Sequence, residues 1–312
     1  MTWAAWRVQR AQIIAASGVV FVLILWLIVT GIVTGHAQTW KYWTDADIYV
    51  LYALPGVLGL TLGAPLVASE SSQGTAHLAW TQSVSRVRWL ASKFVVGSVV
   101  TTLIVIVLGL LVDWWTGKVS ISALTNSGGF SAVRIQPTDF DITGIVVIGY
   151  ALFAFSLGVA LGAWIRRPGW AFALGLPIFA AARIVVQGSL RAHLIAPAVF
   201  TNLTGISLST SAVNRGWLLH SALLPANLTS PPPGRSWAWS DYTRSYDICR
   251  GKPNITDAGA AHCTALSHLH FVIQYQPDSR YWALQGIETA IFIGLGLLLL
   301  RMTVMKLKSW QT

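Results

Sequence analysis

The amino-acid sequence predicts an all-α membrane protein with six transmembrane helices. Composition is the first reason: 54% of the 312 residues are hydrophobic and only 10% are charged, whereas a soluble chain carries about a quarter charged residues. The second reason is that the apolar residues gather into runs of roughly twenty, the length with which a helix crosses about 30 Å of hydrocarbon. Lipid is therefore the expected solvent for most of the chain.

Each of six apolar runs is expected to cross the membrane once, and none contains more than one charge. The runs cover residues 13–34, 48–68, 94–112, 142–165, 170–188 and 282–300. Pro55 and Pro65 interrupt the second run, and neighbouring helices can satisfy the backbone groups that such residues leave open. The predicted domains are helices one to five in residues 1–188, an external subdomain in 189–281, and the sixth helix with a cytoplasmic tail in 282–312.

Lys and Arg in the short connections set the orientation, because short loops rich in these cations remain in the cytoplasm. A cytoplasmic N-terminus places most of them inside: Arg7, Arg10, Arg86, Arg88, Lys93, Arg166, Arg167, Arg301, Lys306 and Lys308. The short outer loops hold only Lys41, Lys118 and Arg134. We therefore expect both termini in the cytoplasm and a multi-pass protein in the plasma membrane. The same rule explains much of the net charge of +10, so nucleic acid is not an expected partner.

The longest polar segment is 189–281, and we expect it outside the membrane, between the fifth and sixth helices. Its first part, residues 194–208, is apolar enough to dip into the membrane or lie on its surface. It is too short to cross.

Both cysteines, Cys249 and Cys263, fall in this external segment. An oxidising exterior and an even count favour a disulfide, which would close a loop of about fifteen residues and contribute roughly 3 kcal/mol. The competing interpretation is a metal site that includes nearby histidines, although their spacing differs from that of known zinc sites. These histidines are His262, His268 and His270.

Residues 70–93 connect the second and third helices in the cytoplasm and contain an amphipathic helix. Its apolar stripe recurs at helical spacing and consists of Ala76, Trp80, Val84 and Val87. Such a helix either lies on the membrane surface and only joins two spans, or it docks into a partner.

Glycines recur at four-residue spacing at positions 31 and 35, 59 and 63, and 158 and 162, within or at the end of three of the runs. Glycine at this spacing lets two helices approach closely. The contact can lie within one chain or between two copies.

Three elements of the sequence resemble a known family. The second span ends in Gly-Ala-Pro-Leu-Val-Ala at 63–68, and Glu70, Gly74-Thr75 and a Leu-Ala-Trp-Thr-Gln-Ser run at 78–83 follow it. Near the end of the chain stand Tyr-Gln-Pro at 275–277, Tyr281-Trp282, Gln285 and Glu288. In these motifs the chain resembles the type-2 ATP-binding-cassette (ABC) transporter permeases, particularly their small six-span actinobacterial members.

The resemblance implies a division of labour. This chain would form the passage, without cofactor, metal or catalytic residue of its own, and a separate cytoplasmic ATPase would bind ATP and Mg and hydrolyse ATP. The helix in the 70–93 connection would be the coupling helix, which docks into that ATPase with the following residues: Glu70, Gly74, Thr75, Trp80, Thr81, Gln82, Arg86 and Arg88. A second permease, either the same chain or a related one, would complete the exporter, with membrane lipids around it. The expected cargo is hydrophobic or amphipathic: a drug, an antibiotic, a peptide or a lipid.

Two other functions fit a multi-pass protein. A membrane sensor or receptor would bind a ligand in its external domain. An intramembrane lipid-modifying enzyme would need a nucleophile, a base or a metal set inside the membrane. The only charges well within the runs are Arg183 and Glu288, at similar depth on successive helices, and we expect them to form an ion pair.

Overall fold

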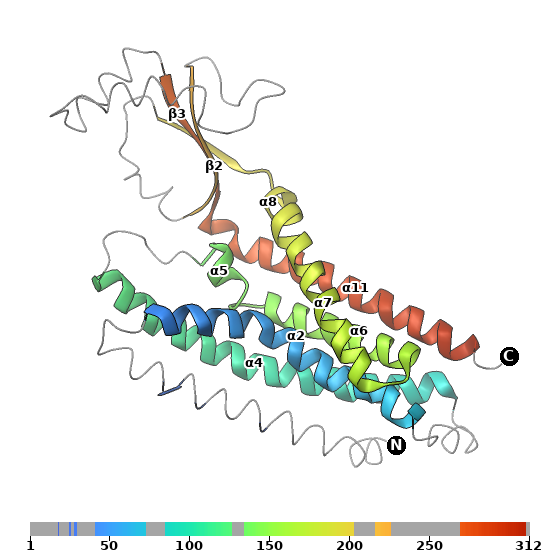
Figure 1. Cartoon of the computed structure of the whole chain (residues 1–312). Coiled ribbons are helices and arrows are strands. Elements are labelled where there is room, and N and C mark those ends of the chain that lie inside the picture. Colours follow the sequence, from blue (N-terminus) through green and yellow to red (C-terminus); the bar gives the residue numbers. More distant parts are fainter. Residues whose placement is uncertain are drawn as a thin grey trace. The chain divides into compact units, whose positions relative to one another are not determined.

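The computed structural model describes residues 41–72, 85–126, 134–202, 216–225 and 269–309, together with positions 18, 25, 28 and 29. These residues belong to two compact units. The first unit contains the long helices, and the second contains a small sheet (Figure 1).

Five long helices of the described residues are apolar enough to cross a membrane. They are α2 (Lys41–Ser72), α4 (Arg86–Asn126), α6 (Val146–Ile165), α7 (Pro168–Val185) and α11 (Tyr281–Ser309). Each contains all or most of one predicted run, so spans two to six are confirmed as helices of membrane-spanning length. The first predicted span, 13–34, lies outside the described residues except for four positions.

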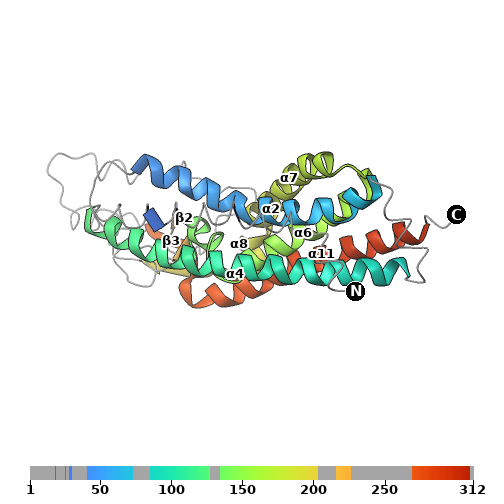
Figure 2. The same cartoon turned by 90° about the horizontal axis from the view of Figure 1, so that it is seen from below.

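Helix α6 lies among the other long helices of the first unit (Figure 1, Figure 2). Of its membrane-spanning residues, 89% are buried, against 28% for α4 and 22% for α11. A helix that is apolar on every side and enclosed in this way is the core of the unit, while its neighbours turn an apolar face toward lipid.

Glycines bring α2 and α6 into backbone contact. A Cβ atom built on Gly59 or Gly63 would overlap backbone atoms of α6, and one built on Gly158 or Gly162 would overlap backbone atoms at Ala64 of α2. Two of the glycine pairs noted in the sequence therefore form a contact within the chain. Close approach of this kind increases the dispersion attraction that holds helices together in lipid.

The third helix begins earlier than the sequence predicts. Helix α4 starts at Arg86 instead of residue 94, and Trp89 is buried. Trp89 and Leu90 pack with the ends of α2, α6 and α11 in one apolar core, which also includes Leu62, Leu66, Val67, Phe155, Val159, Ala163 and Leu307. The last part of the 70–93 connection, from residue 86, thus forms about the first two turns of α4, and residues 73–84 lie outside the described residues.

The second unit contains a three-stranded antiparallel sheet in the order β1-β3-β2. Its strands are β1 (Ala198–Asn202), β2 (Gly216–Pro225) and β3 (Leu269–Pro277). The prediction of an all-α fold is therefore wrong for this region. The middle strand, β3, is rich in aromatic and β-branched residues, which favour strands. β1 occupies part of segment 194–208, which was expected to lie in or on the membrane.

Short elements complete the described chain. Helix α5 (Pro137–Phe140) precedes α6, and the π-helix Val186–Leu190 and helix α8 (Arg191–Leu194) follow α7. In the second unit, the Gln276 side-chain amide donates to the carbonyl oxygen of Ile195 at 2.6 Å. Arg280 donates to the Gln276 side-chain oxygen at 2.9 Å, so the end of β3 is tied to the segment before β1.

Candidate functional site

A buried polar cluster joins helices α6, α7 and α11 of the first unit. It consists of Asp141, which follows α5, Tyr150 of α6, Arg183 of α7 and Glu288 of α11, all at most 8% exposed. Arg183 Nη2 lies 3.3 Å from Asp141 Oδ2, which makes an ion pair. The Tyr150 hydroxyl lies 3.1 Å from Asp141 Oδ1 and 2.6 Å from Glu288 Oε1. One phenol therefore connects two buried carboxyl groups.

The guanidinium of Arg183 has further partners on two helices. It donates to the backbone carbonyl of Tyr52 in α2, and its central carbon lies 4.3 Å from the centre of the Tyr150 ring. A buried charge in a membrane protein is costly unless charges, carbonyl groups or aromatic faces surround it. Arg183 has all three kinds of partner, so its side chain links α7 to α2 and α6.

The predicted partner of Arg183 was Glu288. The ion pair observed for Arg183 is with Asp141, and Glu288 belongs to the same cluster through Tyr150. A direct contact between Arg183 and Glu288 remains a prediction. Asp141 precedes the fourth apolar run by one position, so it is not among the charges that stand out within the runs. Two aspartates directly before an apolar run, at positions 139 and 141, were the available signal.

Gln285 holds the start of α6, one helical turn before Glu288. Its side-chain oxygen accepts the backbone N–H of Val146 at 2.7 Å, and its nitrogen donates to the carbonyl oxygens of Phe140 at 3.1 Å and Thr143 at 3.2 Å. The first N–H groups of a helix have no partner inside the helix. Gln285, fully buried on α11, supplies one from outside. Both residues of the Gln-x-x-Glu motif thus bind the N-terminal part of α6, Gln285 through the backbone and Glu288 through Tyr150.

Asp139 lies in the short helix α5 beside this cluster. Its backbone carbonyl accepts N–H groups of Ile142 at 3.4 Å and Thr143 at 3.1 Å, which closes the turn into α6. Burial raises the pKa of the Asp139 carboxyl above its ordinary value, because desolvation disfavours the charged form.

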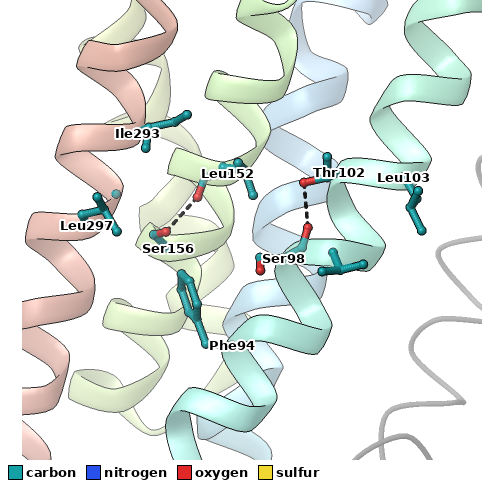
Figure 3. A pocket seen from close by; sticks show the side chains of 10 residues that line it. Phe94, Ser98, Thr102, Leu103, Leu152, Ser156, Ile293 and Leu297 are labelled. Carbon is teal, nitrogen blue, oxygen red and sulfur yellow. Dashed lines mark hydrogen bonds between the residues drawn. The ribbon is translucent and has the colours of Figure 1, made fainter.

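The first unit also contains an open apolar pocket of about 290 Å³. It lies between α4 and α11, and Leu152 and Ser156 of α6 lie between these two helices (Figure 3). The lining residues of all three helices are Phe94, Ser98, Val99, Thr102, Leu103, Leu152, Ser156, Ile293, Gly296 and Leu297.

The hydroxyl groups of the pocket are already hydrogen-bonded within their own helices. Ser98 donates to the Val95 carbonyl at 3.0 Å, Thr102 to the Ser98 carbonyl at 2.8 Å, and Ser156 to the Leu152 carbonyl at 2.8 Å. Figure 3 shows the last two of these bonds. The pocket therefore presents an apolar surface.

Most of the other predicted site residues lie outside the described residues or have only their backbone described. Gly74, Thr75, Trp80, Thr81, Gln82, Cys249 and Cys263 belong to the first group. Glu70 lies in the last turn of α2 and Arg86 starts α4, and nothing further is described for their side chains. Arg88 is exposed in the first turn of α4, one position before the buried Trp89. Among the described residues, no three His, Cys, Asp or Glu side chains are grouped as a metal site would require.

A sequence profile of ABC-2 membrane transporter related proteins matches residues 29–191, just over half of the chain. The chain belongs to the ABC-2 membrane transporter related family. The match confirms the resemblance to the type-2 permeases, and with five apolar helices this ABC-2-related protein is a multi-pass membrane permease. The matched region includes Asp141, Tyr150 and Arg183, whereas Gln285 and Glu288 lie beyond it. No curated protein and no solved structure matches the chain.

Proposed function

We propose that this ABC-2-related permease is the membrane-spanning subunit of an ATP-driven exporter. A separate cytoplasmic ATPase binds ATP and Mg and drives it, and a second permease, the same chain or a related one, completes the passage. The cargo is a hydrophobic or amphipathic compound. The observation that carries the proposal is the family match over residues 29–191, which covers the helices on both sides of the 70–93 connection.

The packing at the end of α2 and the start of α4 supports a coupling role for the residues between them. Coupling requires that a movement of the ATPase moves whole helices instead of bending a loop. The buried core around Trp89 joins α2 and α4 to α6 and α11. A force applied between residues 72 and 85 would therefore reach four helices at once.

Arg88 is placed to contact the ATPase in this proposal. It is exposed, whereas Trp89 beside it is buried, with the Lys93 ammonium 4.4 Å from the centre of its ring. Trp89 thus fixes the first turn of α4, and Arg88 extends from that fixed turn. Glu70, Gly74, Thr75, Trp80, Thr81, Gln82 and Arg86 complete the proposed contact with the ATPase.

We propose that the buried cluster holds α6, α7 and α11 together at the end of α6 that is opposite to the core around Trp89. Asp141 and Tyr150 belong to the N-terminal side of α6, while Val159 and Ala163 at its C-terminal side belong to the core around Trp89. With the C-terminal side of α6 in the cytoplasm, as the distribution of Lys and Arg predicts, the cluster lies toward the outer face. Residues 189–281 are then external, with Cys249 and Cys263 joined by a disulfide.

The first experiment asks whether the permease has an ATPase partner. The tagged full-length permease is expressed together with each ABC ATPase of the same genome in turn, purified, and reconstituted into vesicles. ATP-dependent movement of a fluorescent hydrophobic cation is then measured. We expect the ATPase to copurify, and transport to require ATP hydrolysis. The control is the same complex with the P-loop Lys of the ATPase replaced by Ala. A permease that purifies alone and transports nothing, but binds a ligand through residues 189–281, would favour the sensor.

The second experiment tests the coupling contact. Trp80→Ala, or Arg86 and Arg88 both replaced by Glu, is expected to lower ATPase association and transport while the permease still inserts. Arg167→Glu is the matched control, since it is an exposed cation in the turn before α7. Association and transport that stay at the wild-type level in the Trp80 and arginine variants would refute the contact.

A further inference from the structure

We infer that the apolar pocket between α4, α6 and α11 binds the acyl chain of an anionic phospholipid, and that Arg88 and Arg301 hold its headgroup. The inference depends on the permease being in a membrane, and it is independent of the proposed export function. It assigns a ligand to a pocket that neither the buried cluster nor the coupling residues line; Arg88, beyond the pocket, is the one residue that the proposed ATPase contact also uses.

The lining of the pocket selects a hydrocarbon ligand. All ten lining residues are uncharged and lie in helices that are apolar enough to cross a membrane. The hydroxyls of Ser98, Thr102 and Ser156 are occupied by backbone carbonyls of their own helices. Their oxygens can still accept, but they offer no free donor, so a polar ligand would lose more hydrogen bonds to water than it regains, which is unfavourable. An acyl chain has no such groups to lose.

The dimensions of the pocket suit one acyl chain. Its volume of about 290 Å³ is at the lower end of the range of roughly 300 to 1,000 Å³ found for sites that enclose drug-sized molecules. On α4 the lining runs from Phe94 to Leu103, which corresponds to about 14 Å along the helix. One leaflet of the hydrocarbon core is about 15 Å thick. The pocket is therefore as long as the leaflet that a lipid chain occupies.

Two exposed cations lie beyond the same end of the pocket. In Figure 3, α4 rises from Phe94 to Leu103 while α11 descends from Ile293 to Leu297, so α4 and α11 run in opposite directions. Arg301 follows Leu297 by four positions, which places it one turn further on the same face of α11. Arg88 precedes Phe94 by six positions, about 9 Å along α4.

The helix segments that form the pocket contain no acidic residue. Residues 86–112 of α4, 146–165 of α6 and 289–309 of α11 contain no Asp or Glu. An anionic headgroup next to Arg88 and Arg301 therefore meets no acidic residue of these three helices. Cations at the membrane surface attract anionic lipids by about 1 kcal/mol each, which corresponds to about a fivefold preference. The chain pocket and the cations together select an anionic phospholipid over a zwitterionic one.

The test maps lipid contacts on the purified full-length permease, without an ATPase. The permease is reconstituted in phosphatidylcholine vesicles that contain a trace of phospholipid with a photoreactive acyl chain, carried by either a phosphatidylglycerol or a phosphatidylcholine headgroup. After irradiation, labelled peptides are identified by mass spectrometry. Residues 174–178 of α7 serve as an internal reference, since Leu174 and Ile178 are exposed apolar side chains outside the pocket.

We expect the phosphatidylglycerol label to concentrate on residues 94–103 and 293–297, several-fold above the reference. Ser98→Phe, which fills the pocket from its lining, should reduce that label to the reference level. Val95→Phe is the matched control, because Val95 is exposed on the same helix and does not line the pocket. A Ser98→Phe variant that keeps the wild-type label would overturn the inference.

The headgroup is tested by removing charge. Arg301→Gln and Arg88→Gln should each lower the ratio of phosphatidylglycerol to phosphatidylcholine label about fivefold, without moving the labelled peptides. Lys306→Gln is the control, since position 306 lies about 140° around the helix from position 301. Equal labelling by the two lipids would refute an anionic site. Displacement of the label by an exported compound but not by unlabelled phosphatidylglycerol would assign the pocket to cargo, and adducts between two permease chains would assign it to a second copy. Either result would overturn the inference.

Discussion

Replacing Tyr150 with Phe isolates the hydroxyl group that connects Asp141 to Glu288. The ring itself should stay in place, because it packs edge-on against Phe292 with centroids 4.8 Å apart and lies under the Arg183 guanidinium at 4.3 Å. What is lost is one donor shared by two carboxyl groups that are at most 1% exposed. A hydrogen bond to a charged group is worth about 1.5 to 3 kcal/mol. We therefore expect Tyr150→Phe to lower the free energy of unfolding by about 2 to 3 kcal/mol.

The assay is thermal unfolding of the purified permease in one detergent, followed by tryptophan fluorescence. A loss of this size should lower the unfolding temperature by several degrees, with roughly 2 to 4 °C for each kcal/mol in a chain of this order of size. Tyr49→Phe is the matched control, since Tyr49 is 73% exposed on α2. If both variants unfold at the wild-type temperature, the Tyr150 hydroxyl between the two carboxyl groups contributes nothing to the free energy of unfolding, and the cluster does not hold the helices together as we describe.

Three further predictions follow from the fold. Asp139→Asn should leave the unfolding temperature unchanged below about pH 4 and raise it above that of the wild type at pH 7. Burial raises the pKa of the Asp139 carboxyl in the folded state, so the stability that the protonated form contributes to the wild type is lost as the pH rises through that pKa, and the amide of the variant does not ionise. Gly63→Val should lower the free energy of unfolding by about 3 kcal/mol, since the valine side chain would overlap the Phe155 backbone. Gly109→Val is the control, because position 109 faces open space and the unfolding temperature should change little. Equal yields of folded protein from the two variants would contradict this packing. Mass mapping without reductant should find Cys249 and Cys263 in one linked pair of peptides, and two thiols that react with an alkylating reagent would show that the disulfide is absent.

The long helices could be predicted from sequence because lipid imposes a simple rule. A segment that crosses hydrocarbon must satisfy its own backbone and carry apolar side chains over about twenty residues. Runs two to six obey this rule: three lie within α2, α4 and α11, and the other two form most of α6 and α7. The ends were less predictable. Charged residues at the start of α4 suggested a separate surface helix, whereas Trp89 continues the membrane helix into a buried core.

The sheet could not be predicted from the same rule. β1 and β2 both pair with β3, which lies more than forty residues further along the chain. No periodicity within one segment reveals such pairing. The run of aromatic and β-branched residues in β3 was a signal for one strand. The polar character of residues 189–281 outweighed it.

The buried cluster could be predicted in part. Arg183 and Glu288 stood out because a charge inside an apolar run needs a partner. Asp141 and Tyr150 did not stand out, since one borders a run and the other is an ordinary aromatic residue within it. The geometry shows that the phenol and the bordering carboxyl complete the set. An intramembrane charge therefore has candidate partners among the polar residues just outside the neighbouring runs.

The backbone contact between α2 and α6 has a consequence for biogenesis. Helix α2 leaves the ribosome first, and α4 follows, but the glycine surface of α2 has no match until α6 has been inserted. Helices enter the bilayer one at a time and associate afterwards. During synthesis of nearly one hundred residues, from Ser72 to Ile165, α2 thus faces lipid with small residues and two prolines. A chain that stops before α6 should be recognised as incomplete and degraded, whereas one that stops after α6 already contains the pair around which the other helices assemble.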